Sequence, residues 1–171
     1  MNSSQIVHQT LKDNGVFPNN EMLPLLVYRK ALELPERDPA ALLGDVFEQN
    51  HWPGAWRNGI FGFHHYHSTA HEVLGIYGGE AEVQFGGDDG ITLTVCTGDV
   101  VIIPAGVAHK NLGSSREFGV VGAYPQGQRP DTCYGKPQER ARADRNITTL
   151  ALPLADPVYG ADGIVQRYWL R

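Results

Sequence analysis

Between residues 59 and 125, short apolar runs rich in β-branched and aromatic residues alternate with glycines. The glycines recur roughly every eight to twelve residues, a spacing that is typical of an all-β sandwich or barrel. Glycine pairs such as Gly78-Gly79 and Gly86-Gly87 supply the positive φ angles that hairpin turns require. The pattern therefore predicts strands at residues 60–67, 72–77, 81–85, 91–96, 100–103 and 118–124.

The residues before this region predict an arm and one helix. Residues 1–37 contain turn signals followed by the apolar run Leu25–Tyr28, which we expect to be a strand of an N-terminal arm. From Pro39 to about Asn50, apolar residues recur at roughly helical spacing, and Asp38 is placed to cap the first turn. This is the one short helix that the pattern predicts.

The last third of the chain is polar at first and apolar again near its end. Residues 126–146 are expected to cross the surface. Apolar residues return at 149–154 and 164–170, so we expect residues 147–171 to form return strands on the sheet. Because no internal repeat or linker-like segment interrupts the chain, residues 1–171 are predicted to form a single domain around a core barrel at about 59–125.

Composition narrows the class of protein further. Glycine makes up 20 of the 171 residues, and the charged fraction of 19% lies below the usual ~25%, which favours β structure. The net charge of −5 leaves no basic surface for nucleic acid. No stretch approaches the ~20 apolar residues of a membrane span, and residues 1–10 lack the features of a signal peptide. We therefore expect a cytoplasmic protein, with Cys96 and Cys133 packed rather than reactive.

The placement of histidines carries the chemical signal. Of the seven histidines in the chain, five lie in the predicted β region, at positions 64, 65, 67, 71 and 109. Side chains two apart on a strand share a face and lie ~6.6 Å apart along it. His65 and His67 could therefore turn their rings onto one ion at ~2.1 Å each. His64 and Tyr66 would then face the other way.

The same alternation predicts the surroundings of the ion. Phe61 and Phe63 would share the face of His65 and form an apolar floor. A short turn at residues 68–70 would return the next strand beside the first, and so bring Glu72 to the imidazoles as an anionic ligand. His109, after a buried strand and a proline–glycine turn, is the expected fourth ligand.

A single histidine is more often a hydrogen-bonded structural residue than a ligand, and we keep that interpretation for His64 and His71. For the group of His65, His67, Glu72 and His109, coincidence is much harder to maintain. Two histidines and a carboxylate leave open positions on a divalent ion, which suits the binding of substrate or dioxygen.

The spacing of these residues resembles the two sequence motifs of the cupins. The first motif combines a glycine, a His-x-His pair, a glutamate and a second glycine, and its positions are filled by Gly59, His65, His67, Glu72 and Gly79. The second motif ends in asparagine, and its positions are filled by Gly98, Pro104, Gly106 and His109, with Gly113 in the last one. The chain is also similar to small bacterial cupins of the YjlB-like group at residues 13–28, 64–75 and 156–160.

The resemblance implies an all-β cupin double-stranded β-helix, a jelly-roll-like barrel of two antiparallel sheets, here with one short N-terminal helix. It also implies a metal held by His65, His67, Glu72 and His109, and a homodimer. We expect one divalent transition metal per chain, and the donor set accepts iron, manganese, nickel, cobalt, copper or zinc.

The expected function is that of a mononuclear metal-dependent enzyme acting on a small polar organic molecule, by dioxygenase-type or isomerase-type chemistry. The alternative is a non-catalytic protein that binds or senses metal and a small ligand. Candidate pocket residues are Asn111, on the same strand face as His109, and Tyr124 on the last core strand. Arg57 or Asn58, just before the first core strand, could reach the mouth of the barrel.

Overall fold

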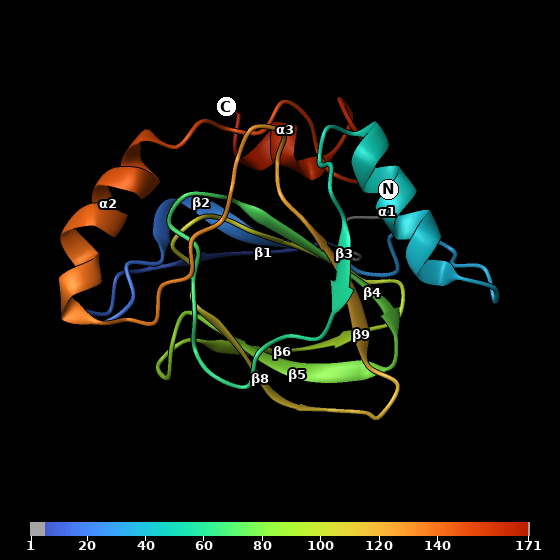
Figure 1. The fold of residues 1–171 in the computed structure, drawn as a ribbon, viewed down its shortest axis with the longest axis horizontal. Coiled ribbons are helices and arrows are strands. Elements are labelled where there is room, and N and C mark those ends of the chain that lie inside the picture. Colours follow the sequence, from blue (N-terminus) through green and yellow to red (C-terminus); the bar gives the residue numbers. More distant parts are fainter. Residues whose placement is uncertain (1–5, 171) are drawn as a thin grey trace.

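Two antiparallel sheets face each other in the computed structural model, which describes residues 6–170 (Figure 1). The larger sheet has the strand order β1-β2-β7-β4-β9-β3, and the smaller one has the order β6-β5-β8. The strands are β1 (Ile6–Leu11), β2 (Asn20–Tyr28), β3 (Trp56–Asn58), β4 (Glu72–Gly78), β5 (Glu80–Phe85), β6 (Ile91–Cys96), β7 (Val100–Ile103), β8 (His109–Ser114) and β9 (Gly119–Ala123). The expected barrel of two antiparallel sheets is therefore confirmed.

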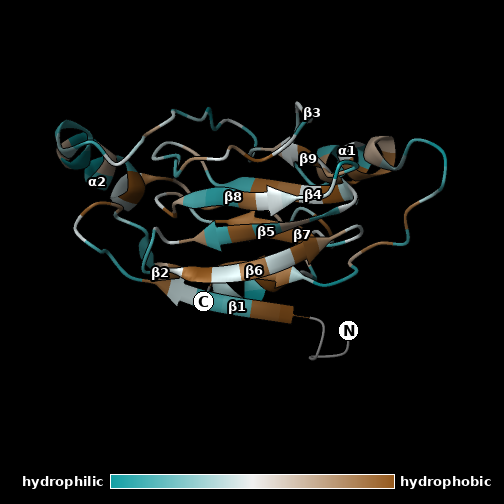
Figure 2. Ribbon diagram, turned by 90° about the horizontal axis from the view of Figure 1, so that it is seen from below, coloured by the Kyte–Doolittle hydropathy of each residue, from teal (hydrophilic) through white to brown (hydrophobic). Residues whose placement is uncertain are grey.

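The central strands of the larger sheet are buried on both of its faces. On β4, Leu74 and Ile76 belong to the apolar cluster between the two sheets, whereas Val73 belongs to a second cluster under the helices. The smaller sheet has one buried face, because residues of β5 alternate between buried and exposed. Hydrophilic residues accordingly appear beside hydrophobic ones along β5 and β8 in Figure 2. This difference explains why β7 is a continuous apolar run.

Helix α1 (Pro39–Gln49) lies where the sequence predicts a helix. It begins at Asp38, whose carboxylate accepts a hydrogen bond from the Ala41 amide at 3.2 Å. Its buried side chains rest on β4 at Gly75, where an added Cβ would lie 2.9 Å from a methyl carbon of Leu43. The glycine therefore lets the helix approach the outer face of the larger sheet.

The expected return strands at residues 147–171 are wrong. Helix α2 (Arg140–Thr149) follows the 3-10 turn η2 (Pro137–Glu139), and the last apolar run forms the short helix α3 (Ile164–Tyr168). The apolar side chains of α3 join the cluster on the outer face of the larger sheet. An apolar run of this length is compatible with either a strand or a buried helix. Here it forms a helix that covers the outer face of the larger sheet.

The predicted strand at residues 60–67 is also wrong in extent. The strand β3 ends at Asn58, and the predicted strand pairs through two isolated bridges, from His65 to His109 and from Tyr66 to Cys133. Gly59 precedes the run and Gly62 interrupts it, and the chain there passes along the opening of the barrel. Among residues 6–170, no helix is both long and apolar enough to cross a membrane.

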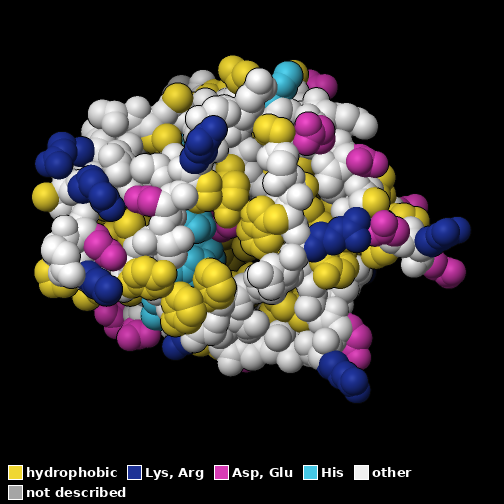
Figure 3. Space-filling model, in the orientation of Figure 1, with side chains coloured by type: hydrophobic (Ala, Val, Ile, Leu, Met, Phe, Trp, Pro, Cys, Tyr) yellow, Lys and Arg dark blue, Asp and Glu magenta, His cyan; other side chains and the backbone are white. Residues whose placement is uncertain are grey.

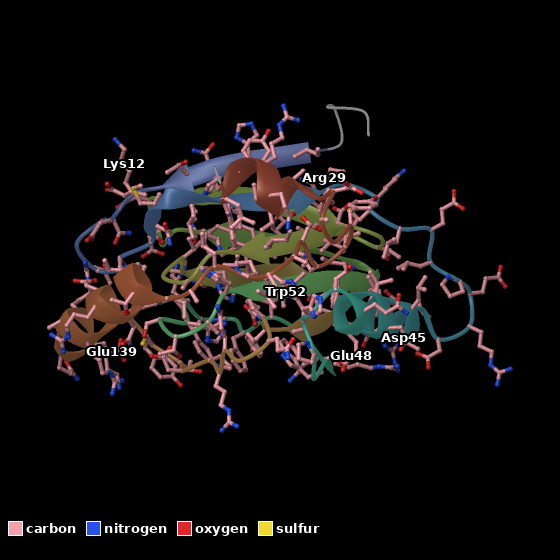
Figure 4. The ribbon with its side chains drawn as sticks, turned by 90° about the horizontal axis from the view of Figure 1, so that it is seen from above. Lys12, Arg29, Asp45, Glu48, Trp52 and Glu139 are labelled. Atoms are coloured by element: carbon pink, nitrogen blue, oxygen red, sulfur yellow. The ribbon has the colours of Figure 1, made fainter. Side chains whose placement is uncertain are left out.

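A buried carboxylate holds the C-terminal segment against the barrel. Asp156 accepts hydrogen bonds from the Tyr28 hydroxyl at 2.9 Å and from the Val165 amide at 3.2 Å. The loop before it is held by Trp52, which lies inside the molecule beside α1 (Figure 4) and donates its indole N–H to the Ala155 carbonyl at 2.9 Å. These bonds fix the part of the chain that the sequence pattern assigned to strands.

We predict that Asp156→Ala lowers the free energy of unfolding by ~3 kcal/mol, because it leaves a buried hydroxyl and buried amides without their acceptor. Urea denaturation followed by circular dichroism measures this change. The control is Asp162→Ala, at an exposed aspartate of the same loop, for which we expect a change within ~0.5 kcal/mol. Equal stability of the two variants would contradict the role of Asp156.

Candidate metal centre

Three histidines from two separate parts of the chain meet at one end of the barrel. His65 and His67 lie in the crossing segment between β3 and β4, and His109 is the first residue of β8. One ring nitrogen of each lies within 4.8 Å of the others, and all three side chains are buried. The ring centroids of His65 and His109 are 4.1 Å apart.

The backbone brings these rings together by crossing between the sheets. His65 and His109 exchange backbone hydrogen bonds of 3.2 and 3.0 Å, which attaches this segment to the smaller sheet. Glu72 then begins β4, which pairs with β7 and β9 of the larger sheet. The predicted hairpin at residues 68–70 is therefore wrong, because the chain passes there from one sheet to the other. Glu72 reaches the histidines across the barrel.

Each of the three rings is oriented by a backbone carbonyl. The Nδ1 atoms of His65 and His109 lie 3.1 Å from the carbonyl oxygens of Phe63 and Val107. Nδ1 of His67 likewise makes a short contact with the Asp131 carbonyl. Because a carbonyl can only accept, each Nδ1 carries the proton and each Nε2 presents its lone pair. Orientation of this kind is typical of metal-ligating histidines.

Glu72 is the one carboxylate in this group. Its Oε1 lies 3.5 Å from Nε2 of His67, and its Oε2 lies 3.2 Å from Nε2 of His109. The Tyr124 hydroxyl donates to Oε1 at 3.2 Å. Burial alone would raise the pKa of Glu72, but the interactions with His67 and His109 outweigh it and hold the pKa well below its usual range. The carboxylate is therefore ionised inside the barrel.

The protonation of the rings differs with their surroundings. Burial, with the neighbouring His109, lowers the pKa of His65 to about 3. Burial also works against a charge on His67, but the Glu72 carboxylate and Asp131 outweigh it and raise the pKa of that ring. An ionised carboxylate among imidazoles of this kind is a suitable donor set for a cation.

The residues fit a divalent transition metal. Oε2 of Glu72 is buried and accepts no well-aligned hydrogen bond, although it lies close to His109. Buried charged oxygens are ordinarily satisfied. A cation bound to this oxygen and to the three Nε2 atoms would satisfy all four donors, and such a set of three nitrogens and one oxygen is common for transition metals.

A cavity of about 320 Å³ leads from the surface to this group. In Figure 3 the histidines are visible through an opening that is flanked by hydrophobic side chains. The cavity is lined by Trp56, Asn58, Gly59, Ile60, Phe61, His65, His67, Glu72, Leu74, His109, Tyr124, Pro130 and Thr132. A small molecule could therefore reach the donors directly.

The structure places two of the four predicted pocket residues in the cavity and two outside it. Tyr124 and Asn58 line the cavity. Arg57 does not, because its guanidinium pairs with Asp38 at 2.9 Å near the start of α1. The Asn111 side chain also lies outside the cavity and accepts from the Gly113 amide at 2.9 Å. The pairing of β8 with β5 is regular from His109 to Asn111 and shifts register only after Asn111, so Asn111 keeps the strand position that alternation gives it while its side chain lies beyond the cavity.

The expectations for the neighbouring aromatic residues need one correction. Phe61 lines the cavity but is 49% exposed, so it belongs to the mouth and not to a floor. Phe63 is 46% exposed and packs against Tyr134 outside the cavity. The segment that carries Phe61 and Phe63 is not a regular strand, so the alternation of side chains between two faces does not extend to these residues. His64 does face away from His65, toward Asp88 at 3.0 Å.

Sequence reasoning missed the loop around Asp131. This loop supplies Pro130 and Thr132 to the cavity wall and the carbonyl that orients His67. The Asp131 carboxylate accepts from both the amide and the hydroxyl of Ser68 at 2.6 Å, which ties the loop to the histidine segment. No pattern in this polar stretch distinguishes it from an ordinary surface loop.

Two facing antiparallel sheets, with a histidine group at the opening between them, are the arrangement that the resemblance to cupins implies. No family model matches the chain. The chain is 41% identical over 159 residues to "Uncharacterized protein YjlB" of Bacillus subtilis (strain 168), and the match covers 93% of each chain. The protein therefore belongs to the same family as YjlB.

Solved structures resemble the chain at the level of the fold. Acireductone dioxygenase from Bacillus anthracis is 17% identical with a TM-score of 0.40, over 54% of this chain and 63% of that one. A DUF861 family protein from Thermotoga maritima is 24% identical with a TM-score of 0.34, over 53% and 92%. The epimerase RmlC from Legionella pneumophila is 14% identical with a TM-score of 0.38, over 71% and 72%. Nothing about activity follows from similarity of this degree.

We predict that His65, His67 and His109 are Nδ1–H tautomers in the metal-free protein, because each Nδ1 meets a carbonyl. Long-range ¹H–¹⁵N NMR at an alkaline pH, above the raised pKa of His67, measures the tautomer. His71 is the internal control, since its Nδ1 accepts from the Ala105 amide at 3.0 Å and the ring must be Nε2–H. Nε2–H signals from the three clustered rings would contradict the geometry.

Proposed function

We propose that this protein binds one divalent transition metal ion through His65, His67, Glu72 and His109. The observation that best supports the proposal is the shared orientation of the three rings, whose Nδ1 atoms are all engaged by backbone carbonyls. When bound, the ion supplies Lewis-acid chemistry or a meeting point for substrate and dioxygen. The donors accept iron, manganese, nickel, cobalt, copper or zinc, and the metal available in the cell decides among them.

We further propose that the metal-loaded protein is an enzyme for a small organic molecule, of dioxygenase or isomerase type. A cavity of about 320 Å³ opens onto the donors. Burial and the neighbouring Glu72 raise the pKa of Tyr124, so its hydroxyl stays protonated and can donate a hydrogen bond beside the reacting centre. The alternative is a binding or sensing protein that uses the same cavity without turnover.

A cytoplasmic location and a homodimer are part of the proposal. Size-exclusion chromatography with light scattering tests the dimer. Turnover is tested by oxygen consumption and product analysis for the protein loaded with each candidate metal, against small acids, sugars and thiols. Consumption or isomerisation that is lost in Glu72→Gln supports an enzyme. Tight binding of a compound that is never converted supports the sensing alternative.

We predict that His67→Ala lowers metal affinity at least ~10-fold. Loss of a group that only orients a metal ligand already has an effect of this size, and His67 is itself a proposed ligand. Elemental analysis after dialysis against limiting Zn²⁺ or Mn²⁺ measures bound metal per chain. His64→Ala is the matched control, because its ring belongs to the same segment and faces away from the cavity. Equal loss of metal from both variants would show that the ion lies elsewhere.

A further inference from the structure

The cavity described above has an unusual distribution of charge. Among the described residues that line it, Glu72 is the one carboxylate, and neither lysine nor arginine is present. Arg57, although next to the lining residues Trp56 and Asn58 in sequence, is held by Asp38 on the outer side. Any positive charge that meets a ligand here must therefore come from the proposed metal ion.

This limits the charge of the ligand. Metal binding requires a deprotonated carboxylate and neutral imidazoles. A divalent ion with Glu72 as its one anionic ligand leaves one net positive charge in the site. A ligand with one negative charge neutralises it. A phosphate ester with two negative charges would leave an uncompensated charge in a largely apolar cavity, which is costly.

The walls limit the shape and polarity of the ligand. Apolar side chains line much of the cavity, namely those of Trp56, Ile60, Phe61, Leu74 and Pro130. The Trp56 and Tyr124 rings are tilted by 32° with centroids 6.4 Å apart. Uncharged polar side chains are few, namely Asn58, Thr132 and Tyr124. A polyol would lose more hydrogen bonds to water than these groups can replace, whereas a flat apolar body would bury its surface against the rings.

Resting on the proposed metal site, we infer that the ligand of this cavity is a small monoanion that chelates the ion through oxygen atoms and places a flat apolar body against Trp56 and Phe61. Phosphorylated sugars are excluded by the same features. The metal ion binds the charged end of the ligand. Trp56 and Phe61, the aromatic mouth of the cavity, select the apolar end of the ligand.

The inference is tested with the Zn²⁺-loaded full-length chain and three probes. Acetohydroxamate and benzohydroxamate chelate through the same monoanionic oxygen pair and differ in the ring, and glucose 6-phosphate represents the excluded class. By isothermal titration calorimetry, benzohydroxamate should bind at least ~10-fold more tightly than acetohydroxamate, about 1.4 kcal/mol. Glucose 6-phosphate should bind more weakly than both.

Variants then locate the ring of the ligand. Phe61→Ala should reduce the preference for benzohydroxamate to below ~3-fold while the affinity for acetohydroxamate and the zinc content stay unchanged. The matched control is Tyr134→Ala, which removes an aromatic ring that is 48% exposed, as Phe61 is 49% exposed, but lies outside the cavity. This control should keep the full preference.

Failure of the inference and failure of the proposed function give different results. A wild-type protein that binds no zinc refutes the proposed metal site. Normal zinc content with equal binding of the two hydroxamates, or with tighter binding of glucose 6-phosphate, overturns the inference alone. A preference that Phe61→Ala retains also overturns it, because the ring would then bind outside the aromatic mouth.

Discussion

The ionised carboxylate of Glu72 inside the barrel is the constraint on which the site depends. A buried charge is tolerated only where donors or an opposite charge meet it. Glu72 begins a central strand of the larger sheet, and His67 and His109 lie within 3.5 and 3.2 Å of its oxygens. The Tyr124 hydroxyl supplies one further hydrogen bond. One carboxylate oxygen nevertheless has no well-aligned donor, and the proposed cation would complete this arrangement.

The fold holds these groups by combining a rigid frame with irregular segments. The larger sheet is packed on both faces, by the smaller sheet and by the helices, so the position of Glu72 is firmly set. His109 likewise begins a strand, whereas His65, His67 and part of the cavity wall come from the segment before β4 and from the loop around Asp131, which hydrogen bonds to Ser68 tie together. Functional residues on loops that a packed scaffold positions are a common arrangement. The loop around Asp131 therefore both forms part of the cavity wall and orients His67.

Local pattern predicted the barrel and the grouping of three histidines better than it predicted the path of the chain. The period of two placed His65 and His67 on one side and His64 on the other, and helical spacing with a capping residue located α1. The helix α3 was missed because a short apolar run fits a strand as well as a buried helix. The crossing between the sheets at residues 68–70 and the shift of register on β8 depend on distant pairing, as at His65 and His109, which no local pattern contains. The candidates Arg57 and Asn111 lie outside the cavity because their side chains have other partners, the Asp38 carboxylate and the Gly113 amide, which the strand pattern does not reveal.

The central claim is that one metal ion joins the two sheets through three imidazoles and one carboxylate. Anomalous scattering from crystals of the protein loaded with a transition metal, recorded on both sides of its absorption edge, tests this directly. The account predicts a single strong peak per chain at ~2.1 Å from the Nε2 atoms of His65, His67 and His109 and next to an oxygen of Glu72. Peaks confined to surface residues, or no peak among these four side chains in fully loaded crystals, would contradict it.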